Sequence, residues 1–152
     1  MRVVPPAGLE QTDFGWEVSP QGMVDLLQRV ATEYEPAEIF ITENGATYPD
    51  TPANDGEIHD DKRVSYLQRH VVAVRDLQNK QVPVKGYFAW SLLDNFEWAE
   101  GYLRRFGLVY VDFATQKRRL KDSGRWYQSF LKADPDERPV AASVDTEVAT
   151  QQ

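Results

Sequence analysis

The sequence predicts an α/β fold in which helices cover a parallel sheet. Two apolar runs, residues 39–41 and 84–93, have the composition and length of buried strands. A segment of helical period precedes each run. The resulting order of helix, strand, helix, strand is typical of parallel strands joined by helical crossovers.

The first helix is predicted by its start signal and by one apolar face. Residues 1–18 contain prolines and glycines without a sustained period, so we expect a loop. Ser19 is the expected N-cap and Pro20 the first helical residue, and Pro36 ends the helix. The apolar face consists of Met23, Leu26, Leu27, Val30 and Tyr34. The first strand follows directly and runs to Thr42.

The rest of the chain continues this order and adds a hairpin. The expected segments are a polar loop at residues 46–60, a helix at 61–79, a strand at 84–93, an acidic and aromatic loop at 94–101, and a hairpin at 106–120. The apolar face of the second helix consists of Val64, Leu67, Val71, Val74 and Leu77. Ser123 is the expected cap of a last helix carrying Trp126, Tyr127, Phe130 and Leu131. Residues 133–152 show no period and predict a disordered tail.

Composition narrows the class of partner. A chain of 152 residues with 41% hydrophobic residues can bury the core of one domain. Its net charge of -7 argues against nucleic acid and anionic membranes, so a neutral small molecule is the expected partner. The chain contains no cysteine, and His59 and His70 have no ligand spacing, so neither a metal nor another cofactor is expected. The sequence shows no membrane span and no signal peptide, which predicts a cytoplasmic location.

Glu43 is the first candidate for chemistry. It follows the apolar run at residues 39–41 and precedes Asn44-Gly45, a pair typical of chain reversal. A carboxylate at the point where a buried parallel strand becomes a loop lies where α/β barrels keep their catalytic groups. The alternative interpretation is a half-exposed glutamate beside a turn.

A second set of residues fits sugar binding. Retaining glycosidases use two carboxylates about 5–5.5 Å apart, one as nucleophile and one as proton donor. Sugars also pack their C–H faces on aromatic rings, and tryptophan adds an N–H donor. Trp90, Glu97 and Trp98 supply these groups near the end of the second strand. Taken singly, Trp90 is more typical of a core residue and Glu97 of a solvated loop acid.

Two motifs together identify a family resemblance. T-E-N-G at residues 42–45 and W-S-L-L-D-N-F-E-W-A-E-G-Y-L-R-R-F-G-L-V-Y-V-D from Trp90 resemble the C-terminal third of a glycoside hydrolase family 1 β-glucosidase. The resemblance extends from Gly15 to Tyr127. It implies the C-terminal portion of a (β/α)8 TIM barrel, with strands 39–42 and 84–93 as the seventh and eighth. Residues 1–132 would form this segment of an incomplete barrel, and residues 133–152 the tail.

The resemblance also implies residue roles. Glu43 would be the nucleophile and Trp90 the aromatic floor under the sugar. The peptide bond between Trp90 and Ser91 would be cis. Glu97 would accept hydrogen bonds from O4 and O6, Trp98 would donate to O3, and Phe106 would close the pocket wall. Because a carboxylate at Glu97 repels a sugar phosphate at close range, unphosphorylated glucosides, galactosides or fucosides are the expected substrates.

Parts of the family's machinery are not found in this sequence. A (β/α)8 barrel needs about 250 residues as a rule. The T-x-N-E-P motif with the acid/base glutamate, the N-terminal glutamine and histidine sugar ligands and the tyrosine that orients the nucleophile are missing. Glu35-Pro36 is the nearest match to N-E-P, but it ends an amphipathic helix. We therefore expect the chain to be inactive without an upstream barrel segment. The alternatives are a non-catalytic sugar-binding module and a truncated product without a function.

Overall fold

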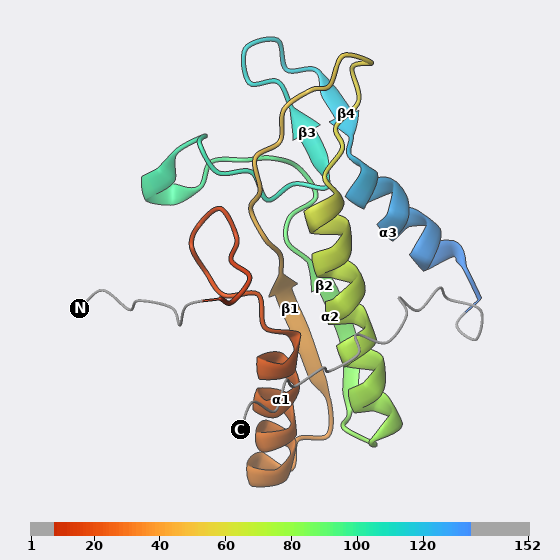
Figure 1. Cartoon of the computed structure of the whole chain (residues 1–152). Helices are drawn as coiled ribbons and strands as arrows, with labels where there is room; N and C mark the ends of the chain where they lie inside the picture. The colour runs from red at the N-terminus through yellow and green to blue at the C-terminus, as the bar shows by residue number, and fades with distance from the viewer. Residues whose placement is uncertain (1–7, 135–152) are drawn as a thin grey trace, which may run out of the picture.

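The computed structural model of the chain describes residues 8–134. The helices and strands, in chain order, are α1 (Pro20–Tyr34), β1 (Ile39–Asn44), α2 (Asp61–Asn79), β2 (Val84–Ala89), the 3-10 helix η1 (Trp98–Glu100), β3 (Val109–Val111), β4 (Arg118–Leu120) and α3 (Asp122–Lys132). Figure 1 shows α1 and α2 along the two-stranded sheet, with the β3–β4 hairpin and α3 beyond its carboxyl end.

The sheet has the predicted parallel topology. β1 pairs with β2 from Ile39 opposite Val84 to Asn44 opposite Ala89. The helices pack on one face of this sheet, where buried side chains of α1, α2 and β2 form a core. That core contains Val24, Ala73, Val74, Leu77 and Val84, with Ile39 and Ile41 packed against it. The helical crossover between the strands is therefore confirmed.

The prediction of fully buried strands is wrong for this chain. In β1, Phe40 is 51% exposed, and in β2, Phe88 is 57% exposed. Ile39 and Ile41 alternate with Phe40 and face the helices. The side of the sheet that carries Phe40 and Phe88 has no covering layer within residues 8–134, so we call it the open face.

Helix α1 has the predicted ends but a different buried face. The Ser19 side chain accepts a hydrogen bond from the Gly22 N–H, and the helix ends at Tyr34, just before Glu35 in the left-handed region. Val24, which the expected apolar face omitted, is the buried residue of α1. The expected Leu26 is 59% exposed, because the helix contacts only α2 and the sheet over a narrow stripe.

The last helix begins differently from the prediction. Lys121, and not Ser123, is the N-cap of α3. Ser123 lies in the first turn and is fully buried, and its backbone N–H and hydroxyl both donate to Asp60. Ser123 thus bonds to the end of the long loop 46–60 instead of capping its own helix.

The second strand is shorter than predicted, and the hairpin is confirmed. β2 ends at Ala89, and the chain after Trp90 runs beside residues 106–109, with the Leu108 N–H donating to the Ser91 carbonyl over 2.8 Å. β3 and β4 pair antiparallel. Of the expected tail at residues 133–152, all but the first two residues lie outside the described part.

The described residues form part of a barrel-like arrangement and no closed barrel. They contain a two-stranded parallel sheet and a two-stranded antiparallel hairpin. None of the helices within residues 8–134 is both long and apolar enough to cross a membrane.

Candidate active site

Glu43 and Trp90 lie together at the carboxyl end of the parallel sheet. Asn44, the residue after Glu43, pairs with Ala89, the residue before Trp90. The Trp90 N–H donates to the Asn44 carbonyl over 2.9 Å. The Trp90–Ser91 peptide bond is cis, as the resemblance implied. The structure therefore places the predicted nucleophile and the predicted aromatic floor on adjacent strand ends.

The segment after Glu43 is packed tightly against β2. The Tyr87 hydroxyl donates to Asn44 Oδ1 over 2.7 Å, and burial raises the pKa of Tyr87, so this hydroxyl remains a donor. A Cβ at Gly45 would lie 1.8 Å from the Trp90 carbonyl oxygen. The T-E-N-G motif thus has two structural requirements: an amide that meets Tyr87, and a glycine that lets two backbones approach.

The Glu43 carboxylate itself faces solvent. Glu43 is exposed, and its carboxylate forms no hydrogen bond or ion pair with another residue of the range 8–134. Trp90 is 38% exposed beside it. Both side chains are therefore accessible to a ligand.

Glu97 and Trp98 lie on a separate loop. This loop, residues 94–107, carries η1 at its tip and projects away from the sheet end (Figure 1). The Glu97 N–H donates to the Gly101 carbonyl over 2.7 Å, and Trp98 is 84% exposed. In the described part of the chain, no hydrogen bond or ring contact joins Glu97 or Trp98 to Glu43 or Trp90. The predicted constellation is therefore only half assembled.

Phe106 is the buried wall of this region. It is 5% exposed, and its ring lies 6.3 Å, centroid to centroid, from the rings of both Phe14 and Trp16. The Ser91 N–H donates to the Phe106 carbonyl over 3.2 Å, which joins Phe106 to the residue after Trp90. The sequence analysis missed Trp16, which is 54% exposed and stacks on Phe14. Its signal was a tryptophan inside a loop otherwise rich in polar and turn residues.

A buried charge cluster lies behind the loop 94–107, and the sequence analysis missed it entirely. It consists of Asp50, Asp60, Arg63, Asp94, Arg105 and Lys121. Helical spacing places Arg63 among charged surface positions of α2, yet its side chain is 1% exposed. No pattern in the sequence distinguishes this arginine from its solvated neighbours.

Arg63 is the centre of the cluster. It forms a bidentate pair with Asp50 at 3.0 and 2.9 Å and a 2.5 Å bond with Asp60. Its Nε donates to the Ala46 carbonyl and its Nη2 to the Arg105 carbonyl. Burial lowers the pKa of Arg63, but the two carboxylates outweigh this and raise it. Arg63 remains charged and joins the segment after Glu43 to the residue before Phe106.

Lys121 connects Asp50 to Asp94. Its Nζ lies 2.5 Å from Asp50 Oδ2 and 2.8 Å from Asp94 Oδ1, and the side chain is fully buried. Burial lowers the pKa of Lys121, and the charge of Arg63 lowers it further, against the two carboxylates. The lysine therefore depends on both carboxylates to stay charged in the interior.

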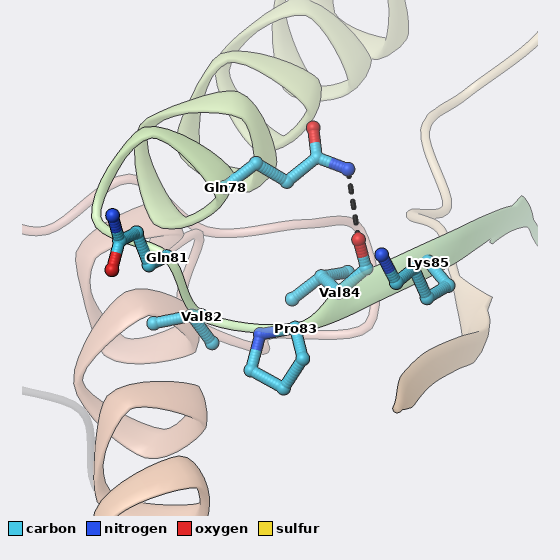
Figure 2. Close-up of a pocket in the computed structure, with 6 residues that line it drawn as sticks. All are labelled: Gln78, Gln81, Val82, Pro83, Val84 and Lys85. Carbon is cyan, nitrogen blue, oxygen red and sulfur yellow. Dashed lines mark hydrogen bonds between the residues drawn. The ribbon is translucent and has the colours of Figure 1, made fainter. Parts of the chain in front are cut away.

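A cavity of about 350 Å³ lies at the opposite end of β2. Figure 2 shows the residues that line it at the turn from α2 into β2, where Gln78 Nε2 donates to the Val84 carbonyl over 2.8 Å. Val84 begins β2 and Trp90 follows its end. The cavity is therefore separated from Glu43 by the length of the strand and is not part of the candidate site.

The described residues offer no metal site. No group of three or more histidine, aspartate or glutamate side chains within residues 8–134 could hold a metal ion. His59 instead bonds two carboxylates, Asp122 at 2.7 Å and Asp55 at 3.2 Å. His70 is buried and bonds the Tyr66 carbonyl. Both histidines have structural partners.

Comparison with known proteins identifies the family. Residues 3–135 match the family model described as glycosyl hydrolase family 1. The chain belongs to this family. It is 52% identical over 124 residues to β-glucosidase A of Thermotoga maritima, which covers 82% of this chain and 28% of that enzyme. It is also 47% identical over 119 residues to a 6-phospho-β-galactosidase of Streptococcus equi subsp. zooepidemicus, covering 78% of this chain and 25% of that protein.

Solved structures of family 1 enzymes show the same fold. The family 1 β-glucosidase of Thermotoga maritima, solved in complex with glucoimidazole, superposes with a TM-score of 0.82 at 51% identity. The match covers 84% of this chain and 29% of that one. The chain thus spans about 28% of the length of the curated relatives it matches, and it corresponds to one part of their barrel.

Proposed function

We propose that this chain is the nucleophile-bearing part of a retaining β-glycosidase of the β-glucosidase type. The observation that carries the proposal is the exposed Glu43 carboxylate at the carboxyl end of β1, beside Trp90 on the adjacent strand end. Membership of glycosyl hydrolase family 1 supports it.

The chemistry assigned to Glu43 is a double displacement. A Glu43 oxygen attacks the anomeric carbon, the bond to the leaving oxygen breaks, and a glycosyl ester forms on Glu43. Water then attacks the same carbon and releases the sugar and the carboxylate. The proton for the leaving oxygen comes from a general acid, which contributes about 10²–10⁴-fold to the rate.

The proposed binding roles are those that the family resemblance implies for Trp90 and for residues of the loop 94–107. Trp90 supplies the ring on which the sugar face packs, Glu97 accepts from O4 and O6, and Trp98 donates from its indole N–H to O3. Phe106 closes the wall behind them. The exposure of Trp90 and Trp98 supports these roles, since both rings are accessible to a ligand.

We further propose that the sugar is an unphosphorylated, terminal β-D-glucosyl residue. A carboxylate at Glu97 repels the dianion of a 6-phosphosugar. Relatives of similar identity include both a β-glucosidase and a 6-phospho-β-galactosidase, so overall identity does not separate the two substrate classes. Glu97 carries the distinction.

An upstream barrel segment is the proposed partner of this chain. β1 and β2 pair only with each other in the described residues, and Phe40 and Phe88 stay exposed on the open face. Parallel strands of this kind are normally buried on both faces. We propose that the preceding strands cover this face and supply the general acid, and that the chain alone is inactive on poor leaving groups.

Labelling with an activated substrate analogue tests the proposal. A 2-fluoro-2-deoxyglucoside with a dinitrophenolate leaving group needs no proton donor, and its fluorine slows release of the ester. We expect intact mass to show one adduct, and peptide mapping to place it on Glu43. The variant Glu43→Gln is the control and should stay unlabelled. An adduct elsewhere, or one that persists in Glu43→Gln, would overturn the assignment.

The phosphate preference needs a separate measurement. The same reagent carrying a 6-phosphate should label Glu43 more slowly than the unphosphorylated form, and Glu97→Gln should narrow the difference. Faster labelling by the phosphorylated reagent would assign the chain to the other substrate class.

A further inference from the structure

The base of the loop 94–107 is closed by backbone hydrogen bonds, such as that from the Asp94 N–H to the Val109 carbonyl, and by the Asp94 side chain. Asp94 Oδ1 accepts a hydrogen bond from the Gly107 N–H over 2.9 Å, which joins the first residue of the loop to the last. Asp94 Oδ2 accepts from Arg105 Nη1 over 2.6 Å. The proposed sugar-binding residues Glu97 and Trp98 lie between these two attachment points.

The tip of the loop has weaker attachments of its own. It contacts the rest of the chain through the ion pair between Arg104 and Asp13, whose side chains are 28% and 32% exposed. Two ring contacts accompany this pair, Arg104 over Phe14 at 5.4 Å and Tyr102 beside Phe113 at 4.5 Å. Exposed ion pairs contribute little because solvent screens them. The Glu97 N–H bonds to Gly101 within the loop, and Asn95 Nδ2 donates to Ser91 Oγ and to the Leu93 carbonyl just before the base. The position of the tip therefore depends mainly on its base.

Asp94 is in turn fixed to the body of the chain. It accepts from Lys121 Nζ over 2.8 Å and from the Val111 N–H over 3.3 Å, and its side chain is fully buried. Lys121 also binds Asp50, and Asp50 binds Arg63. Arg63 Nε donates to the carbonyl of Ala46, three residues after Glu43. A continuous path of buried bonds thus runs from the loop base to the segment that follows the nucleophile.

We propose that Asp94 is a positioning residue that sets how Glu97 and Trp98 meet the sugar bound at Glu43. The proposal rests on the glycosidase function proposed above. Asp94 itself does not touch the sugar, because its carboxylate is enclosed by Arg105, Lys121 and backbone N–H groups. Its effect should fall on sugar binding and spare the attack by Glu43.

Asp60 is a matched control within the same charge cluster. Its side chain is also fully buried, and it also accepts from a backbone N–H, that of Ser123 at 2.8 Å, and from an arginine, Arg63. Its bonds run to α2 and α3, and none reaches the loop 94–107. A general loss of stability should follow from either substitution, whereas a loss of sugar positioning should follow from one.

The first experiment compares Asp94→Asn with Asp60→Asn in the full chain. The readout is the concentration dependence of Glu43 labelling by the activated 2-fluoroglucoside. We expect Asp94→Asn to raise the half-saturating concentration about tenfold, the loss of roughly one good charged hydrogen bond, with the maximal rate within about twofold of wild type. Asp60→Asn should leave both unchanged. Equal shifts in the two variants, or no shift in Asp94→Asn, would overturn the proposal.

Amide hydrogen exchange supplies a readout that needs no reaction. Asp94→Asn should speed exchange in residues 95–106 and leave α1 unchanged, while Asp60→Asn should speed exchange only near the start of α3. If the wild-type chain is never labelled, the glycosidase proposal fails for this chain, and exchange still decides the role of Asp94. Unchanged exchange in residues 95–106 of Asp94→Asn would refute it.

A milder variant covers the case in which Asp94→Asn does not fold. Arg105→Gln removes one partner of Asp94 at a side chain that is 17% exposed. It should move exchange and half-saturation in the same direction by a smaller factor. An effect on the maximal rate alone would contradict positioning through the loop.

Discussion

The charge cluster and the open face differ in how far their side chains are paired or buried by other residues of the chain. Behind the loop 94–107, the charge cluster pairs three acidic with three basic side chains, and all of them except the partly exposed Arg105 are buried. On the open face, Phe40 and Phe88 stay more than half exposed, and at the end of β1 the Glu43 carboxylate has no hydrogen bond or ion pair within residues 8–134. Every charge of the cluster therefore has a partner, whereas the face that carries Phe40 and Phe88 is left uncovered by the described residues.

The comparison shows which parts of the chain are stabilised by its own described residues and which are not. Buried charges need partners close by, since an unpaired one costs several kcal/mol. In the charge cluster, residues of this chain supply all the partners. Exposed rings on a parallel sheet cost little in isolation but mark a surface that another element covers. The described residues therefore stabilise the charge cluster by themselves, and the proposed glycosidase chemistry requires a further segment on the open face.

The largest expected effect on stability comes from a substitution at the centre of the charge cluster. Arg63→Met leaves Asp50 and Asp60 buried without their arginine, so we expect the free energy of unfolding to fall by about 3–5 kcal/mol. The control Arg29→Met removes an ion pair with Glu33 whose arginine side chain is 71% exposed, and should cost about 1 kcal/mol or less. Urea unfolding followed by circular dichroism measures both. Equal losses of unfolding free energy in Arg63→Met and Arg29→Met would show that the charge cluster does not stabilise the fold.

Apolar truncations on the two faces of the sheet sharpen the contrast. Leu77 is fully buried in the core between the helices and the sheet, so Leu77→Ala should cost about 2–5 kcal/mol. Phe88 on the open face is 57% exposed, and Phe88→Ala should cost about 1 kcal/mol or less. The same unfolding experiment compares them. A large cost at Phe88 would mean that the open face is covered in solution, for instance by a second copy.

The hydroxyl of Tyr87 tests the boundary between the two regions. Tyr87→Phe removes the bond to Asn44 beside Glu43 and should cost about 0.5–1.5 kcal/mol. Tyr34→Phe, at a side chain 74% exposed on α1, is the control and should change nothing measurable. Labelling of Glu43 should slow only in Tyr87→Phe. Unchanged labelling would show that Asn44 does not orient the nucleophile.

The two histidines should give the smallest effects, with opposite dependence on pH. Burial lowers the pKa of His70, so the unfolded chain binds a proton more readily, and stability should fall as pH drops below about 6.5. Hydrogen bonds to Asp122 and Asp55 raise the pKa of His59. Its contribution is present below about pH 6.5 and is lost as pH rises through the raised value.

Unfolding measured between pH 5 and 8 separates these two contributions. His70→Gln should remove part of the loss on the acid side, and His59→Gln part of the loss on the alkaline side, the latter more weakly at high salt because His59 is exposed. Parallel pH profiles for both variants would contradict the assignment.

The fold was largely predictable because its signals are local. The cap at Ser19, the bounds of α2 and the parallel order of β1 and β2 follow from short-range patterns of hydrophobicity and turn residues, and the structure confirms them. The cap at Ser123 was wrong because Ser123 bonds to Asp60, a residue far away in sequence. The strand run at residues 39–41 was taken as buried because its three apolar residues are consecutive, although the middle one, Phe40, faces the open side.

The candidate site was predictable only where a residue type itself carries the chemistry. Glu43 and Trp90 follow strand ends, and strand order places them together. The relation of Glu97 and Trp98 to them depends on the loop base, and hence on Asp94, Lys121 and Arg63. These charged residues resemble solvated surface positions in the sequence. Only the long-range pairing of the folded chain reveals that they are buried.

The charge cluster also has a consequence for synthesis on the ribosome. Its members are separated widely along the chain, from Asp50 to Lys121, so the cluster closes only after α3 has begun to emerge. Until then Asp50 and Asp94 lack the ammonium group that lies between them in the folded chain. Nascent chains shorter than this carry the whole T-E-N-G strand and the tryptophan loop, yet they lack the side chain that joins Asp50 to Asp94. The bonds that join Asp50 to Asp94 therefore cannot form until Lys121 has left the ribosome.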